Sequence, residues 1–321
     1  MPILLVFLIS LPVLAAGEPP LMSRADYDQL MKDISNWGRW GNDDELGTLN
    51  LITDKKRKRA ARLVKKGISV SLALDLNKVK DPLNQNPFLH EVGTSEFGGH
   101  QVAADRYEVE YHGFAHSHMD GLPHFAHKGY FYNGVPYAAA IPTGTKKLGI
   151  HNAGIKGVFT RGVLVDMPAH LGVDYLDPGT AITADDITDW EKKNRVRIGS
   201  GDVLLIRTGR WEKVRQDGQW NFLEKAAGLH ASVASFLRER DVAVIGCDGV
   251  SDVMPSGVEG RVNPLHELVL VGLGMPILDN LDLDPLAEVA AAQKRTTFLY
   301  VGAPLRVPGG TGSPLNPLAV F

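Results

Sequence analysis

The alternation of apolar, strand-like runs with helical patterns is the feature that most constrains the fold of this chain. Six runs rich in Val, Ile, Leu, Tyr and Phe predict strands, at 68–74, 107–111, 162–166, 203–207, 242–246 and 297–301. Helical patterns separate some of these runs, at 183–194, at 230–240 and around 265–273. We therefore expect an α/β domain with a mixed β-sheet and flanking helices.

The region before the first predicted strand is expected to form an N-terminal helical extension. Helical patterns cover 24–34 and 54–66, the second with Thr53 as N-cap and Gly67 as C-cap. The basic run 55–59 falls in the second helix and favours a solvated helix face over a binding patch. The Gly- and Pro-rich tail from Gly302 is expected to be a loop. No Ser- or Gly-rich linker divides the chain, so residues 22–321 are predicted to form a single domain.

The first sixteen residues differ from the rest. Residues 2–16 are apolar and uncharged and end in small residues, which is typical of a secretory signal peptide over residues 1–16. This predicts a secreted or periplasmic protein. The alternative is a disordered or packed apolar arm on a cytoplasmic protein. No second long apolar run follows, so no membrane partner is expected.

Composition limits the classes of partner. The chain has 321 residues and a formal net charge of −3. Nothing in it is basic enough to indicate nucleic acid as a partner. Cys247 is the only cysteine, which excludes an intrachain disulfide. Because it follows the apolar run 242–246, we interpret it as a packed thiol at a strand end rather than a nucleophile.

A cluster of histidines carries the strongest indication of chemistry. Five of the eleven histidines lie between His112 and His127, and among them is the pattern His118-x-Asp120-x-x-x-His124. On an extended chain His118 and Asp120 point the same way, and a turn at 121–123 can bring His124 back to the same point. Two imidazoles and a carboxylate suit zinc, manganese or iron. The alternative is a solvated His-rich loop that binds no metal.

Further ligands are expected from later segments. The best candidates are His266, near the start of a predicted helix, and Asp279, just beyond its end. Each also has an ordinary structural interpretation, His266 as a helix-start residue and Asp279 as a helix cap. Asp248 and Asp252 follow the strand 242–246, where carboxylates often serve sites in α/β folds, but a turn role suits them equally well.

Other common catalytic motifs are missing from the sequence. It has no Gly-x-Gly-x-x-Gly after a strand, no Walker loop and no Gly-x-Ser-x-Gly nucleophile elbow. Water activated by a divalent ion, with an imidazole to move the proton, is therefore the favoured chemistry.

The segment Ser117-His-Met-Asp-Gly-Leu-Pro-His124 resembles the metal-binding signature of the cyclase family, His-x-Gly-Thr-His-x-Asp-x-Pro-x-His. That family includes bacterial kynurenine formamidase and isatin hydrolase. Blocks similar to its longer members follow in order, at 40–50, 201–209, 278–283 and 309–317. The resemblance implies a mixed α/β fold of the swivelling β/α type, a homodimer, a Zn²⁺ or Mn²⁺ site and hydrolysis of a linear or cyclic amide.

Carried over by motif, the resemblance implies His118 and Asp120 as metal ligands and His266 as a later one. It implies that His124 is a ligand or the catalytic proton acceptor, and Asp279 stands where short members have Glu. The first motif histidine falls on Phe114, which favours a single metal ion. His112 or His116 could substitute for it.

The leading hypothesis is thus a metal-dependent hydrolase that cleaves an amide or small cyclic amide. A lactone or ester hydrolase with the same site is the nearest alternative, and a non-catalytic, exported metal- or ligand-binding protein is the more distant one. Five of the aromatic residues within 107–132 are compatible with a flat, apolar, aromatic small-molecule substrate, although a place in the core is the favoured interpretation of them. They are Tyr107, Tyr111, Phe114, Phe125 and Tyr130.

Overall fold

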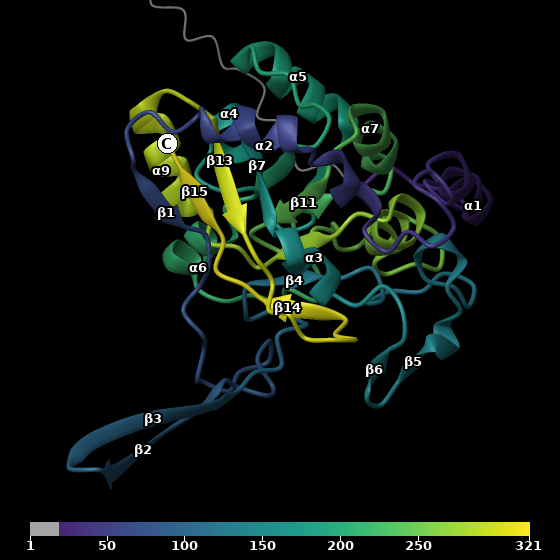
Figure 1. Ribbon diagram of the computed structural model, residues 1–321. Helices are drawn as coiled ribbons and strands as arrows, with labels where there is room; N and C mark the ends of the chain where they lie inside the picture. The colour runs from purple at the N-terminus through teal and green to yellow at the C-terminus, as the bar shows by residue number, and fades with distance from the viewer. Residues whose placement is uncertain (1–18) are drawn as a thin grey trace, which may run out of the picture.

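A computed structural model describes residues 19–321, so the signal peptide predicted over residues 1–16 lies outside the described part. The centre of the protein is a nine-stranded mixed sheet in the order β1-β15-β13-β7-β9-β11-β12-β4-β14 (Figure 1). The strands β7, β9, β11 and β12 run parallel, and the other pairs are antiparallel. In chain order these strands are β1 (Ser69–Ser71), β4 (His118–Asp120), β7 (Val158–Asp166), β9 (Val203–Arg207), β11 (Val244–Cys247), β12 (Ile277–Asp279), β13 (Thr297–Gly302), β14 (Gly312–Pro314) and β15 (Leu318–Val320). The predicted mixed α/β class is confirmed.

Strand periodicity divides the core into two layers, one on each face of the sheet. Successive side chains on a strand point to opposite faces. In β9, Leu204 belongs to one buried cluster, whereas Val203 and Leu205 belong to the other. Helices α1 (Arg24–Asp33), α5 (Ala184–Asn194) and α7 (Val233–Arg240) pack on the first face, and α9 (Asp284–Gln293) packs on the second. The sheet is therefore covered on both faces, as expected for a largely parallel centre.

Shorter elements complete the described chain. They are the helices α2 (Asp54–Ala61), α3 (His151–Lys156), α4 (Met167–Leu171), α6 (Arg210–Asp217) and α8 (Pro264–His266), the π-helix η4 (Glu267–Leu273), the 3₁₀ turns η1 (Gly47–Leu51), η2 (Tyr132–Gly134) and η3 (Tyr137–Ala139), and the short strands β5 (Ala140–Ile141), β6 (Gly144–Thr145), β8 (Ala181–Ile182) and β10 (Gly228–Leu229). Among residues 19–321, no helix is long and apolar enough to cross a membrane.

Local signals place several helix starts correctly. The Thr53 side chain caps α2, and Thr183 forms a capping box with Asp186 at the start of α5. The predicted end of the second helix is wrong, because α2 stops at Ala61 rather than continuing to 66. The backbone N–H groups of Lys66 and Gly67 instead donate to the carbonyl of Phe321. Hydrogen bonds therefore hold this segment against the C-terminal end of the chain.

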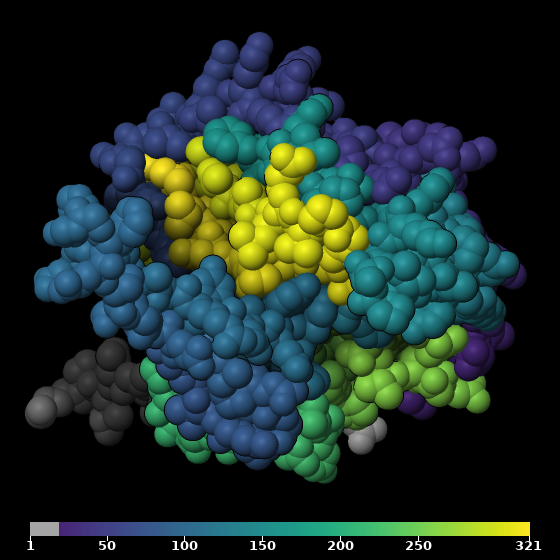
Figure 2. Space-filling view, turned by 60° about the horizontal axis from the view of Figure 1, so that its bottom comes forward, coloured from purple at the N-terminus to yellow at the C-terminus, as the bar shows by residue number. Residues whose placement is uncertain are grey.

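The predicted strand 107–111 is only partly correct. Residues up to Glu108 belong to β3 (His100–Glu108), which pairs with β2 (Leu89–Phe97) in a two-stranded hairpin. Every residue of both strands is exposed, so the hairpin is a projecting arm rather than part of the main sheet (Figures 1 and 2). Alternating polar residues predict a strand with one buried face, whereas both faces of this arm are open.

The expectation of a loop after Gly302 is also wrong in part. The tail contains β14, which pairs with β4, and β15, which lies between β1 and β13. Figure 2 shows this C-terminal segment at the centre of one face of the molecule. Each strand has only three residues and pairs with a strand far away in the sequence, β4 or β1. The Gly and Pro content of the tail therefore suggested a loop. Cys247 is buried at the end of β11, as predicted.

Candidate metal centre

Strand pairing brings the first candidate ligands together. In the antiparallel pair β4–β12, Asp279 lies directly opposite His118, and Ile277 lies opposite Asp120. Directly opposed residues share a face of the sheet, and so do residues two apart on one strand. His118, Asp120 and Asp279 therefore converge, and all three are buried, with at most 2% of their surface exposed. Met119 points the other way, into the second core layer.

Three histidines surround the Asp120 carboxylate. Asp120 Oδ1 lies 2.7 Å from His112 Nδ1, 3.3 Å from His118 Nε2 and 3.8 Å from His124 Nε2. The rings of His112 and His124 are stacked, with centroids 3.8 Å apart and planes 4° apart. His118 Nδ1 lies 2.8 Å from the carbonyl of His116, which leaves its Nε2 directed at Asp120. The 112–124 segment thus folds so that three of its histidines contact its own Asp120 carboxylate.

His266 enters the same cluster from the end of α8. Its Nε2 lies 3.2 Å from Asp279 Oδ2 and 3.5 Å from Asp120 Oδ2. Its Nδ1 lies 2.5 Å from Asp252 Oδ2, and the other Asp252 oxygen accepts the Leu265 N–H at 2.7 Å. A carboxylate behind an imidazole fixes the ring and its tautomer, which is the usual support of a metal-binding histidine.

Burial and charge oppose each other in this cluster. Burial alone would raise the pKa of Asp120, but the neighbouring His118 and His124 hold it well below its usual range. Burial would lower the pKa of His118 and of His266, but the surrounding carboxylates raise both values. Burial dominates at His124 and lowers its pKa to about 3. His124 is therefore neutral at physiological pH and can accept a proton or bind a metal.

The donors fit a divalent ion. Among the described residues, no well-aligned hydrogen bond reaches either Asp120 oxygen, although both are buried, and the contact with His112 Nδ1 at 2.7 Å is short but poorly aligned for one. Buried polar atoms without partners are costly, and a cation placed among them would satisfy several at once. Two donor groups have the spacing of a metal site, His112–Asp120–His124 and His118–Asp120–Asp279. They share Asp120, and imidazole with carboxylate suits zinc or manganese.

The structure brings together every residue predicted for the site: His118, Asp120, His124, His266 and Asp279. Of the two histidines considered as substitutes for Phe114, His112 contacts Asp120, whereas His116 belongs to neither donor group. Whether one ion or two bind stays a prediction, since the shared carboxylate allows either. The missing motif histidine and the density of histidines pointed to His112 or His116, but neither signal chose between them.

The two aspartates left open by the sequence have different roles. Asp252 holds His266, as described above. Asp248 accepts hydrogen bonds from the backbone N–H groups of Thr208, Gly209 and Arg210, at distances from 2.8 to 3.2 Å. It therefore organises the start of α6 and has a turn role.

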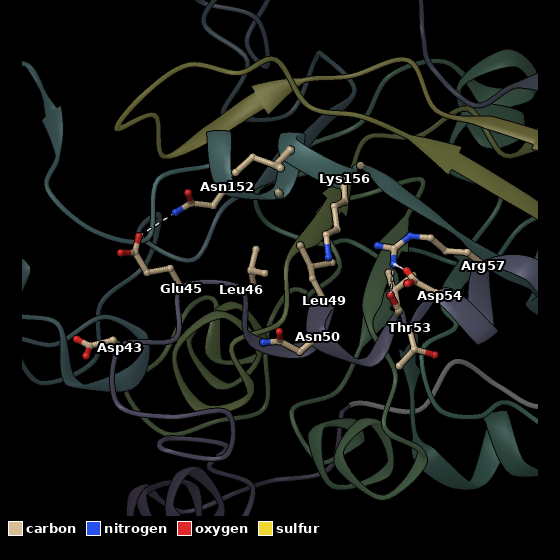
Figure 3. A pocket seen from close by; sticks show the side chains of 14 residues that line it. Asp43, Glu45, Leu46, Leu49, Asn50, Thr53, Asp54, Arg57, Asn152 and Lys156 are labelled. Carbon is tan, nitrogen blue, oxygen red and sulfur yellow. Dashed lines mark hydrogen bonds and ion pairs between the residues drawn. The ribbon is translucent and has the colours of Figure 1, made fainter.

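A pocket of about 320 Å³ adjoins the cluster. His112 forms part of its wall, next to Gly113, Phe114 and His116, and the loop 82–86 lies among the facing residues. A larger cavity of about 620 Å³, shown in Figure 3, is lined by residues of 43–57 and 152–157. None of its lining residues belongs to the histidine cluster, whereas the smaller pocket reaches the cluster through His112.

Comparisons with known proteins agree with this geometry. The model of the Cyclase family ("Putative cyclase") matches residues 54–252, more than half of the chain. A crystal structure described as a novel cyclase is 29% identical and superposes with a TM-score of 0.81, covering 91% of this chain and 99% of its own. No curated protein shows significant similarity to the chain.

Two more distant structures share the fold. Isatin hydrolase A from Ralstonia solanacearum is 21% identical, with a TM-score of 0.55, over 79% of this chain and 92% of its own. An isatin hydrolase bound to the product analogue thioisatinate is 20% identical, with a TM-score of 0.54, over 82% of this chain and 95% of its own. At this level of identity the likeness shows the fold alone.

Proposed function

This chain belongs to the cyclase family, and on that basis we propose that it is a hydrolase, dependent on Zn²⁺ or Mn²⁺, that cleaves an amide or cyclic amide C–N bond. The observation that carries the proposal is the buried Asp120 carboxylate, which accepts no well-aligned hydrogen bond among the described residues and has four imidazoles within 3.8 Å. His118, Asp120, Asp279 and His266 would hold the ion, with His112 and His124 beside it. A bound divalent ion lowers the pKa of a water molecule and polarises a carbonyl oxygen.

His124 is the residue we propose for proton transfer. Its side chain is 25% exposed, whereas that of His118 is 2% exposed, so it is the more accessible of the two rings. Stacking on His112 fixes the ring plane. When water adds to the carbonyl carbon and the C–N bond breaks, His124 Nε2 takes a proton from the water and passes it to the leaving nitrogen.

This role separates amide from ester hydrolysis. An amide nitrogen leaves poorly unless it is protonated, whereas an alkoxide or phenoxide leaves more readily. The experiment compares isoindolin-1-one with phthalide, a lactam and a lactone of the same ring size, for the wild-type protein and His124→Gln. We expect turnover of the lactam by the metal-loaded wild-type protein and a loss of about 10²–10⁴-fold in the variant, with a smaller loss on the lactone.

The outcomes distinguish the three hypotheses. Turnover of the lactone alone would make the protein a lactone or ester hydrolase. Stoichiometric metal without turnover of either ring, or of the open-chain pair formanilide and phenyl formate, would favour a binding protein. His100→Ala, which changes an exposed histidine of the arm, is the matched control and should behave as wild type.

We also propose export, on the basis of the apolar segment 2–16. Removal of a signal peptide would leave a mature chain that starts near residue 16 or 17. Intact-mass measurement of protein expressed with its native leader tests this. Soluble protein that retains residues 1–16 would contradict export.

A further inference from the structure

His116 is a buried imidazole that the proposed chemistry does not use. Only 2% of its surface is exposed, and among the described residues neither ring nitrogen has a hydrogen-bond partner. It belongs to neither metal-donor group. In the signature His-x-Gly-Thr-His-x-Asp-x-Pro-x-His this position is glycine, so the fold of the segment does not require a ring here.

The backbone of His116 already has a structural task that any residue could perform. Its carbonyl lies 2.8 Å from His118 Nδ1 and accepts the Asn280 amide at 3.2 Å. The side chain takes no part in these contacts. An imidazole offers a donor and an acceptor, and leaving both buried without partners costs free energy that an apolar residue would avoid. A group supplied from outside the chain could provide the missing partner.

Such a group would lie in the pocket of about 320 Å³ beside the cluster, which we take as the substrate pocket. His116 and His112 both line the 320 Å³ pocket, so one wall joins the free imidazole to the metal cluster. Leu83, Phe114 and Leu223 give the pocket apolar surface. None of the residues that line it is lysine or arginine, and Glu110 is its one acidic residue. With Asn84, Gln85 and Asn86 also in the wall, such a lining favours an uncharged molecule that carries polar groups and disfavours an anion.

We propose that His116 determines specificity by hydrogen-bonding a second polar group, a carbonyl or ring N–H, of an uncharged cyclic substrate whose reacting carbonyl reaches the cluster beyond His112. This inference rests on the proposed function and adds the substrate class to it. A site built to pair with a polar group discriminates strongly against the analogue that lacks the group, because its own buried atoms then stay unpaired.

The experiment uses two ring-matched cyclic amides, phthalimide and isoindolin-1-one, which differ only in the second carbonyl. Binding by calorimetry and kcat/KM are measured at neutral pH for metal-loaded wild type, His116→Leu and His116→Asn. Because phthalimide is intrinsically more reactive, the quantity compared is the phthalimide to isoindolin-1-one ratio in each protein. We expect His116→Leu to lower that ratio about tenfold and His116→Asn, which keeps a donor and an acceptor, to restore part of it.

Two measurements separate this role from a structural one. Metal content should be the same in wild type and both variants, since His116 is not a ligand. The thermal midpoint of His116→Leu should rise, because an apolar side chain of similar size removes two unpaired buried atoms. A fall in the midpoint, or a ratio within twofold of wild type, would overturn the proposal.

A third ligand tests the charge preference. Phthalimide that carries a ring carboxylate should bind at least about tenfold more weakly than phthalimide, since no cationic side chain lines the pocket. Equal binding would overturn the uncharged class. If wild type turns over neither these compounds nor the open-chain amide formanilide, the proposed function fails, but the calorimetric ratio still decides the role of His116. Absence of phthalimide binding to the metal-loaded protein would count against that role.

Discussion

At the scale of single residues, Asp120 is the side chain on which the cluster depends, because both donor groups include it. We expect Asp120→Ala and His118→Ala each to lose the bound metal. Removing one ligand leaves the others unable to hold a divalent ion at usual concentrations. Elemental analysis of the purified variants measures this, with His100→Ala as control. Stoichiometric metal in either variant would show that the ligand assignment is wrong.

Protons should compete with the metal at the same residues. The raised pKa values of His118 and His266 mean that both imidazoles hold a proton at a higher pH than a free histidine does. A metal ligand must be deprotonated. Metal affinity should therefore be greatest above these raised values and fall as the pH drops through them, by about tenfold per pH unit for each proton displaced.

Titration calorimetry at several pH values, in buffers of different ionisation enthalpy, counts the protons released on metal binding. Without metal, the same two groups give the folding stability the opposite dependence on pH. A raised folded-state pKa stabilises below the unfolded value of about 6.5 and loses that effect as the pH rises through the folded value. Metal binding that is independent of pH between 5 and 8 would contradict this account.

At the scale of elements, the segment that carries the histidines is held by a buried polar network. The Arg210 guanidinium, at the start of α6, donates to Asn280 Oδ1 at 2.6 Å and to the Phe114 carbonyl at 2.8 Å. The Asn280 amide donates in turn to the Gly113 carbonyl at 2.7 Å. Asn280 directly follows Asp279, so the network ties the end of β12 to the 112–118 segment.

Arg210→Met should therefore loosen the site without removing a ligand. The change leaves Asn280 Oδ1 and the Phe114 carbonyl buried without a donor, at a cost of about 1–3 kcal/mol each. We expect the free energy of unfolding, measured in urea, to fall by about 2–6 kcal/mol, together with weaker metal binding. Arg238→Met, which changes an arginine that lies on α7, away from this network, is the control. Unchanged stability would show that the network carries little energy.

The same scale shows how far sequence reasoning reaches. Residues with a local signal were predicted well: the apolar run 203–207 is β9, and Thr183 caps α5 where the pattern predicts. The pairing of His118 with Asp279 could not be derived, because it depends on a register between segments about 160 residues apart. The resemblance named Asp279, but only the antiparallel pairing explains why it reaches the site. A similar reason explains why His112 was not chosen as a ligand: its approach to Asp120 depends on the turn that follows it.

At the scale of the whole molecule, the arm β2–β3 lacks the support that its length requires. Nine residues per strand extend it about 30 Å, and an isolated hairpin of two strands is at best marginally stable in water. Val92, Phe97 and Val102 are among its exposed apolar side chains. Between Leu89 and Glu108 it carries four acidic side chains and one arginine. Such a surface is more stable against a partner than in solvent.

We expect that partner to be a second copy of the chain, which is the homodimer that the family resemblance implies. The sequence favours a solvated face for the basic run 55–59, but the wider region 55–66 contains eight lysines and arginines and no acidic residue. Most of these cations are exposed, so the region complements the charge of the arm. Replacing residues 91–106 by a short Gly-Ser turn should convert a dimer into a monomer, as measured by sedimentation or light scattering at micromolar concentration.

Glu91→Lys combined with Asp105→Lys keeps the hairpin and should weaken the dimer in a salt-dependent way, because a contact between unlike charges becomes repulsive. A wild-type monomer, or a dimer that persists without the arm, would rule out this assembly, and the metal content of the arm-deleted protein shows whether each copy still binds its own ion.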